Sequence, residues 1–225
     1  MAGYLTAEHM VTKAIKQKLQ DINGYINFFA FEGVRKTSFS SERVRGLNDV
    51  LKKYPEVRII QSIATDWTPK YVEFALPRLL SRYLKCQVAG IWGANSALAR
   101  TSSQILIEKG LVPNIDFVTS GTDWDKKSVQ SVYDGKVLSI AGGHMAIGSW
   151  IITLIHDYHN GIDFDSSVYL NKVSLMNRTS AEKFLKYFSG DDWNFIDYTQ
   201  YSKFENKNLK RYDFSFSHIL DNISN

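Results

Sequence analysis

Apolar residues follow two spacings along this chain, and the two alternate from one segment to the next. Short, nearly continuous apolar runs predict buried strands, whereas apolar residues three and four positions apart predict amphipathic helices. Gly, Asn, Ser and Thr gather where one pattern gives way to the other, as turns require. The expected strands are residues 25–31, 57–64, 87–93, 115–119, 137–141 and 168–175.

Helices are expected before, between and after these strands. The second is capped near Ser40 or Ser41, and the third starts with Thr68 as its N-cap and is kinked by Pro77. Strands that alternate with helices predict a parallel, doubly wound α/β sheet, flanked by helices and joined by right-handed crossovers. The expected helices are residues 4–24, 40–51, 68–83, 96–109, 129–133, 145–158 and one that starts at 179–180.

Bulk properties narrow the classes of function. The net charge of +4 comes from 27 basic and 23 acidic residues with no basic cluster, so we expect no nucleic-acid partner. The single cysteine, Cys86, excludes an internal disulfide and a thiolate metal cage. The N-terminal segment has no apolar signal core, and the longest apolar run, residues 145–155, is too short to span a bilayer.

Polar and aromatic side chains follow the expected strands at their carboxyl ends. These ends meet at one edge of a parallel sheet, so we expect the side chains to converge there and Asn95 to offer free donors and acceptors. An arginine, a carboxamide and carboxylates can hydrogen-bond hydroxyl groups, while an indole covers the C–H face of a small polyhydroxylated molecule. The residues concerned are Arg43, Asp66, Trp67, Asn95, Asp123 and Trp124.

A structural interpretation exists for each of these residues taken alone. Arg43 could form a surface ion pair, Trp67 could belong to the core, Asn95 could be a turn residue and Asp123 a helix cap. Their shared position at one sheet edge is what favours a binding site.

Other candidate chemistry is weaker. His156 and His159 have a spacing that could hold a metal, but no third ligand is evident and histidines suit the last turn of a helix, so we expect no metal and no cofactor. Asp123 and Asp125 could form an acid and base pair, although carboxylates at a helix start are more simply caps. The chain lacks a nucleophile elbow, a Walker loop and the pattern G-x-G-x-x-G.

Five short motifs occur in a specific order along the chain. They are SERVRGL at 41–47, TDW at 65–67, GANSALA at 93–99, GTD at 121–123 and YDGK at 133–136. Together they resemble the type I periplasmic binding proteins, and within them the ribose-binding and LuxP-like, sugar-type branch. The resemblance implies that an aromatic residue stacks on the sugar and that three polar residues hydrogen-bond it, here Trp67 with Arg43, Asn95 and Asp123.

The chain also departs from this pattern. Ser96 stands where the family usually has Asp after the asparagine, and Ala99 stands where Gly is common. A polar ligand contact often found after the fifth strand falls on Gly142, and His144 could replace it.

The resemblance begins at the first helix of the second of the family's two lobes. We therefore expect a second lobe with the first lobe missing: residues 1–142 as the ligand-binding α/β lobe, 143–175 as a crossover helix and return strand that pack on the absent lobe, and 176–225 as a C-terminal helix and aromatic-rich tail. The apolar surface of residues 145–158 would then need cover from a homodimer, a domain swap or the rest of the chain.

In function, the resemblance implies a non-catalytic solute receptor in the periplasm that serves an ABC transporter or a sensor kinase, with a membrane permease or that kinase as partner. The alternative is an α/β enzyme acting on a small sugar, with Asp123 or Asp125 as acid or base. The effector-binding core of a LacI-type regulator is disfavoured, because no helix-turn-helix pattern precedes the first helix.

Overall fold

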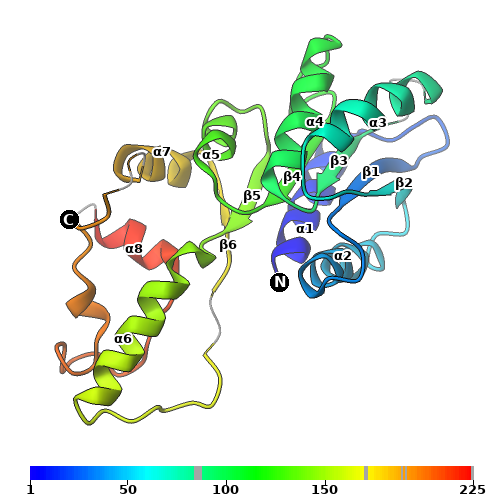
Figure 1. The fold of residues 1–225 in the computed structure, drawn as a ribbon. Helices are drawn as coiled ribbons and strands as arrows, with labels where there is room; N and C mark the ends of the chain where they lie inside the picture. Colours follow the sequence, from blue (N-terminus) through cyan, green and yellow to red (C-terminus); the bar gives the residue numbers. More distant parts are fainter. Residues whose placement is uncertain (84–87, 170–171, 189, 191, 224–225) are drawn as a thin grey trace.

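The computed structural model describes residues 1–83, 88–169, 172–188, 190 and 192–223, and within them a six-stranded sheet organises the chain (Figure 1). The strand order is β2-β1-β3-β4-β5-β6; the first five strands run parallel and β6 pairs antiparallel with β5. This confirms the predicted α/β fold class. The strands are β1 (Ile26–Glu32), β2 (Val57–Ala64), β3 (Gly90–Gly93), β4 (Val118–Thr122), β5 (Ser139–Gly142) and β6 (Ser174–Met176).

Helices cover both faces of the sheet (Figure 1). The pair α1 and α2 packs together on one face, and α3 and α4 pack together on the other. Farther along the chain, α5 packs on α7. The helices are α1 (Ala2–Lys16), α2 (Ser38–Leu51), α3 (Lys70–Arg82), α4 (Ser96–Glu108), α5 (Lys126–Tyr133), η2 (His144–Ala146), α6 (Ile147–His159), α7 (Arg178–Tyr187), η3 (Tyr198–Tyr201) and α8 (Phe216–Asn222).

Strand β1 contributes to the hydrophobic clusters on both faces of the sheet. Its side chains point alternately to the two faces, so Phe28 joins the cluster under α1 and α2, while Phe29 and Phe31 join the cluster under α3 and α4. All three rings are at most 1% exposed, and burying each contributes about 1.5–3 kcal/mol. Burial on both faces explains why this strand reads as a continuous apolar run.

Several predicted boundaries were wrong for reasons of turn chemistry. The first helix ends at Lys16 rather than near Gly24, because Lys18 has a φ of 55° and Asp21 then organises a turn. The second helix starts earlier than predicted, with Thr37 as its N-cap in place of Ser40 or Ser41. The strand expected from residue 87 starts at Gly90, and Gln87 itself lies outside the described residues.

Two later strands are also displaced. The fourth starts at Val118 because residues 112–117 form a turn in which Asn114 has a φ of 62°. The last is reduced to Ser174–Met176. The following helix is capped by Asn177, which with Ser180 forms a capping box, so the predicted start at 179–180 was late by one to two residues.

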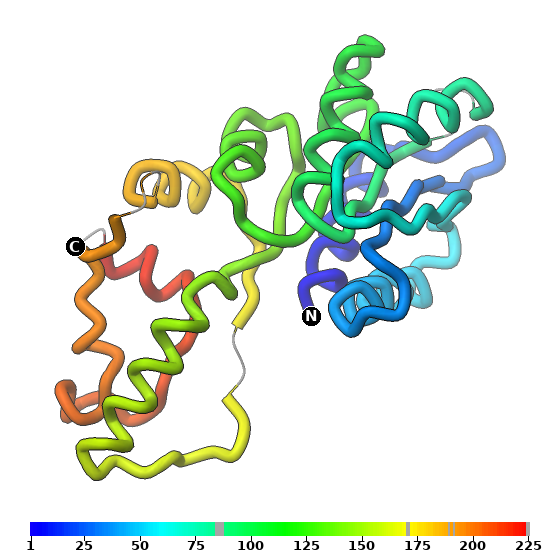
Figure 2. The backbone as a smooth tube through the Cα atoms, in the orientation of Figure 1, coloured from blue at the N-terminus to red at the C-terminus, as the bar shows by residue number. Residues whose placement is uncertain are grey.

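The C-terminal part of the chain lies beside α6, whose backbone runs between the return segment to β6 and the tail (Figure 2). The indole of Trp150 is 3% exposed and stacks on Phe214 with ring centroids 5.3 Å apart. The hydrophobic cluster around Trp124 joins the C-terminal part of the chain to β5 and α7. It includes residues on both sides of residue 142, the predicted boundary between the first two parts of the chain. The three-part division of the chain therefore stays a prediction.

Asp157 anchors the tail to α6. Its carboxylate is 1% exposed and accepts hydrogen bonds from the Lys203 amide (2.7 Å), from the Tyr212 hydroxyl (2.7 Å) and from the Ser202 hydroxyl. Burial alone would raise the pKa of Asp157, but these hydrogen bonds outweigh it and hold the pKa below its usual value. The sequence pattern gave no sign of this buried carboxylate, which lies between two histidines at a helix end.

We expect Asp157→Asn to lower the free energy of unfolding by roughly 2–3 kcal/mol, the scale of charge-assisted hydrogen bonds. In the wild-type protein the same contribution is present above the unfolded-state pKa of about 3.9 and is lost as the pH falls through the lower folded-state pKa. Urea unfolding followed by tryptophan fluorescence at several pH values measures both effects. The exposed Asp163→Asn is the matched control and should leave both unchanged.

The rest of the chain covers only part of the apolar surface of α6. Trp150 is buried, and Met145 and Leu154 pack partly against the C-terminal cluster, whereas Ile147 and Ile151 stay 42% and 50% exposed. No helix within the described ranges is long and apolar enough to cross a membrane.

Candidate ligand-binding site

A pocket of about 360 Å³ opens at the carboxyl edge of the sheet, where β1, β2, β3 and β4 end. Four residues that the sequence placed at this edge converge on it from four different connections. Two further residues at the start of α2 complete its wall. The lining residues are Thr37, Phe39, Arg43, Trp67, Asn95 and Asp123.

Arg43 and Asp123 form the polar centre of the pocket. The guanidinium donates two parallel hydrogen bonds to the carboxylate, of 2.6 and 3.0 Å, and a third of 2.7 Å to the Ala94 carbonyl oxygen. The arginine side chain is 16% exposed and the aspartate side chain 33%, so the carboxylate remains open to solvent on one side. The two charges neutralise each other, and the bidentate geometry fixes both planar groups.

Trp67 supplies an aromatic wall. The Arg43 guanidinium carbon lies 5.4 Å from the centre of its ring, within the range of a cation–π contact. A Cβ atom at Gly33 would lie 2.1 Å from the indole, so the glycine is what allows the ring to lie against the end of β1. The Trp67 carbonyl oxygen accepts a hydrogen bond of 3.0 Å from the Asn95 side chain, which ties the wall to the next strand end.

Backbone strain is present at two of the lining residues. Trp67 has a φ of 71° and Asp123 a φ of 78°, in the left-handed region that non-glycine residues seldom adopt. Such a conformation costs on the order of 1–3 kcal/mol and persists where neighbouring contacts over-determine it. Here the Trp67 amide donates to the Thr65 hydroxyl oxygen (3.0 Å) and the Asp123 amide to the Ala141 carbonyl oxygen (2.7 Å).

Asn95 already has two partners, so the sequence-based expectation of free donors and acceptors holds only in part. Its side-chain oxygen caps α4 by accepting from the Leu98 amide at 2.9 Å, and its side-chain nitrogen donates to the Trp67 carbonyl oxygen. A carboxamide has two donors and two acceptor lone pairs, so one of each is left for a ligand. The turn is tight, because a Cβ at Gly121 would lie 2.5 Å from the Asn95 carbonyl oxygen.

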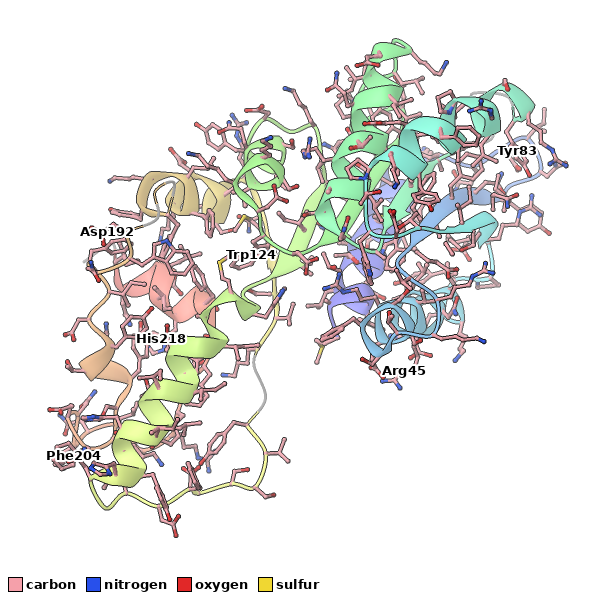
Figure 3. All side chains as sticks on the ribbon, viewed as in Figure 1. Arg45, Tyr83, Trp124, Asp192, Phe204 and His218 are labelled. Carbon is pink, nitrogen blue, oxygen red and sulfur yellow. The ribbon has the colours of Figure 1, made fainter. Side chains whose placement is uncertain are left out.

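The three other predicted site residues lie outside the pocket lining. The Asp66 carboxylate accepts from the Thr68 amide (3.0 Å) and pairs with Lys70 (3.1 Å), and the hydrogen bonds from Thr68 lower its pKa. Trp124 is 5% exposed and lies between the sheet and the C-terminal helices (Figure 3), with its indole N–H donating to the Ile140 carbonyl oxygen at 3.2 Å. His144 stands at the margin, with Nε2 3.3 Å from Asp123 Oδ1.

Sequence reasoning missed Phe39. This ring is 72% exposed although it lines the pocket, and it lies four residues before Arg43, on the same face of α2. This spacing could have predicted Phe39 as a lining residue, because an aromatic residue one helical turn before Arg43 is expected to lie on the same face of the helix.

Asp125, the other half of the suggested acid and base pair, is the N-cap of α5. Its carboxylate accepts from the Ser128 amide (3.0 Å) and the Ser96 hydroxyl (2.7 Å). Burial alone would raise the pKa of Asp125, but these hydrogen bonds outweigh it and lower the pKa. A general acid needs a raised pKa, so Asp125 is a poor candidate for that role.

No group of three or more His, Cys, Asp or Glu side chains within the described ranges is arranged to hold a metal ion. His156 instead faces Glu205, with Nε2 3.1 Å from the carboxylate.

Comparison with known proteins assigns the fold to a family. The model of the periplasmic binding protein domain matches residues 1–162. The chain belongs to the periplasmic binding protein domain family. No curated protein sequence matches it. The match covers every residue that lines the pocket.

Solved structures of periplasmic binding proteins share the fold. A periplasmic sugar-binding protein from Pseudomonas fluorescens has a TM-score of 0.77 and 22% sequence identity, over 97% of this chain and 67% of that one. An ABC transporter solute-binding protein from Actinobacillus succinogenes 130z with bound D-allose has a TM-score of 0.66 and 19% identity, over 80% and 59%. A galactofuranose-binding protein has a TM-score of 0.65 and 18% identity, over 83% and 62%. The chain thus spans about three fifths to two thirds of the length of these structures.

Proposed function

We propose that this chain recognises a small sugar-like solute as part of a periplasmic solute-binding protein, without catalysing a reaction. The observation that carries the proposal is the pairing of Arg43 with Asp123 beside Trp67 in one pocket. Two of the similar structures, the one with bound D-allose and the galactofuranose-binding protein, support the same class of ligand.

The pocket chemistry suits a neutral polyhydroxylated molecule. Because the two charged groups among the described lining residues compensate each other, a charged ligand would gain little, whereas hydroxyl groups can donate to the open side of Asp123 and accept from Asn95 and Arg43. Trp67 and Phe39 offer apolar surface to the C–H faces of a sugar ring. Specificity would come from the hydrogen bonds between ligand hydroxyl groups and the Arg43–Asp123 pair. A ligand without a matching hydroxyl would leave these polar side chains unpaired.

A receptor of this kind would work in the periplasm and pass its solute or signal to a membrane permease or a sensor kinase. In such a system, ligand binding shifts the population of conformations that the membrane partner recognises. The other partner expected from the sequence, a second copy of this chain over residues 145–158, would serve association and not solute recognition.

The experiment is a calorimetric titration of the chain with a panel of neutral aldopentoses and aldohexoses, followed by analysis of the recovered sugar. We expect at least one to bind and to be recovered unchanged. Asp123→Asn should weaken its binding at least tenfold, because the carboxylate that orders Arg43 becomes a neutral amide.

Asp66→Asn is the matched control, since this carboxylate lies outside the pocket lining and should leave binding unchanged. Conversion of a sugar by the wild-type chain, abolished in Asp123→Ala, would favour the enzyme alternative. If the Asp66 and Asp123 variants weakened sugar binding equally, this pocket would not be the binding site.

A further inference from the structure

A second pocket is built from residues 187–223, near the C-terminal end of the chain. Its volume is about 390 Å³, within the range of roughly 300–1,000 Å³ that is usual for small-molecule sites. The end of α7, the short helix η3 and the helix α8 supply its walls, and α7 and α8 also contact each other (Figure 1). Within the described ranges, this pocket shares no lining residue with the pocket at the sheet edge.

Apolar side chains form much of the wall of this pocket. Two of them, Ile196 and Ile219, are 6% and 1% exposed, while the Phe195 ring is 45% exposed. The rings of Phe195 and Tyr187 lie near each other, with centroids 6.5 Å apart and planes inclined by 42°. Aromatic rings next to aliphatic side chains suit a ligand with an apolar body.

Tyr201 brings a buried hydroxyl to this wall. The residue lines the pocket and is only 3% exposed, and its ring is held against Trp150 and His218, with centroids 5.1 and 5.4 Å away. Among the residues that the structure describes, no group lies in hydrogen-bonding geometry with the Tyr201 hydroxyl oxygen. A buried hydroxyl is costly to leave unpaired, so this one points to a partner from outside the chain.

The Tyr201 hydroxyl lies beside Asn222, another lining residue. Burial raises the pKa of Tyr201, and the nearby Asn222 side chain opposes only part of this rise. The Asn222 side-chain nitrogen donates its hydrogen bond elsewhere, to the Gln200 side-chain oxygen at 3.2 Å. Tyr201 therefore keeps its proton at neutral pH and offers an O–H donor next to a carboxamide in the pocket wall.

The charge of the wall disfavours an anion. Asp197 lines the pocket, and hydrogen bonds from the Thr199 hydroxyl (2.6 Å) and the Thr199 amide (3.0 Å) lower its pKa, so its carboxylate is charged at neutral pH. The described lining residues include no lysine, arginine or histidine that would compensate a negative ligand. A cation would also gain little, because the Asp197 carboxylate is exposed to water.

We propose that this pocket is a second binding site, for a small, uncharged and largely apolar organic molecule that carries a hydrogen-bond acceptor. The apolar body of the ligand lies against Phe195 and the two isoleucines, and its acceptor receives the hydrogen bond from the Tyr201 hydroxyl. Such a ligand differs from a polyhydroxylated sugar in chemistry, and the site differs from the sheet-edge pocket in place. The proposal does not depend on sugar binding.

The test is an NMR titration of the full chain, labelled with nitrogen-15, with benzamide, acetanilide and acetophenone. Each probe is an uncharged ring with a carbonyl acceptor. We expect at least one to give saturable shifts of the Gln200 and Asn222 side-chain amides, while the Trp67 indole signal stays in place. Benzoate has a similar ring but a negative charge, so it should bind at least tenfold more weakly.

Three variants assign the binding to this pocket. Tyr201→Phe removes only the hydroxyl and should weaken binding at least tenfold, and Phe195→Ala should weaken it because part of the apolar wall is lost. Tyr198→Phe is the matched control, since this tyrosine also belongs to η3 but its hydroxyl pairs with Ser149 at 3.1 Å, outside the pocket. It should bind like the wild-type chain.

Urea unfolding of Tyr201→Phe checks the premise separately. Its free energy of unfolding should be no lower than that of the wild-type chain, because no hydrogen bond within the protein is lost. A clear loss of stability would show that the hydroxyl already has a partner in the chain and would overturn the proposal. It would also be overturned if none of the three uncharged probes bound, or if Tyr201→Phe bound them as tightly as the wild-type chain.

Discussion

Replacing Arg43 by alanine is expected to weaken sugar binding by about 100-fold or more. The guanidinium holds Asp123 through two hydrogen bonds and lies against the Trp67 ring, so its loss removes a ligand donor and leaves two neighbouring pocket groups unsupported. Hydrogen bonds to charged groups contribute about 1.5–3 kcal/mol each, and about 1.4 kcal/mol corresponds to a tenfold change in affinity.

Two further variants make this test specific. Arg43→Lys keeps the charge but not the planar fork, so it should lose most of the affinity as well. Arg45→Ala is the matched control, because this arginine lies on the same helix, pairs with Glu42 and has a side chain that is 68% exposed. Titration calorimetry with a sugar identified in the panel gives the three affinities. An Arg43 variant that binds like the wild-type chain would exclude Arg43 from the site.

Replacing Trp124 by alanine is expected to lower the free energy of unfolding by about 3–5 kcal/mol, as for other large aromatics removed from a core. The indole is 5% exposed, meets Phe184 and Phe216 edge to face, and donates a hydrogen bond to Ile140. Its position next to Asp123 in the sequence suggested ligand contact, whereas the structure places it in the C-terminal cluster. Urea unfolding measures the effect.

The conservative Trp124→Phe separates the two interpretations. It keeps an aromatic ring in the cluster and is expected to remain folded with unchanged sugar affinity. Trp67→Phe should also remain folded, because the half-buried position tolerates the change. It should weaken sugar binding, because a smaller ring at the pocket wall weakens stacking. A Trp124→Phe protein that is stable but has lost sugar binding would show that Trp124 belongs to the binding site.

The sequence contained enough information for the sheet and for the edge at which the pocket lies. Strands such as β1 bury both faces, and this leaves an unmistakable apolar run that stops where the polar residues begin. Because parallel strands end at one edge, Arg43, Trp67, Asn95 and Asp123 could be expected together from the order of strands and helices alone.

What the sequence could not supply is the direction in which each side chain points after a strand. Asp123 and Trp124 are neighbours, yet one faces the pocket and the other the C-terminal cluster, and the backbone between them turns through the left-handed φ of 78° at Asp123, which the residue pattern did not indicate. Asn95 likewise serves as a helix cap and as a pocket residue, two roles that share one residue type. The burial of Asp157 depends on tail residues some 45 to 55 positions away, which no local pattern can reveal.

The most direct test of the binding site is an NMR titration of the chain, labelled with nitrogen-15, with a neutral monosaccharide from the panel. We predict saturable shifts of the Trp67 indole N–H, the Asn95 side-chain amide and the backbone amides near Arg43 and Asp123, while the Trp124 indole signal stays in place. Shifts confined to other parts of the chain, or none with any sugar at millimolar concentration, would contradict it.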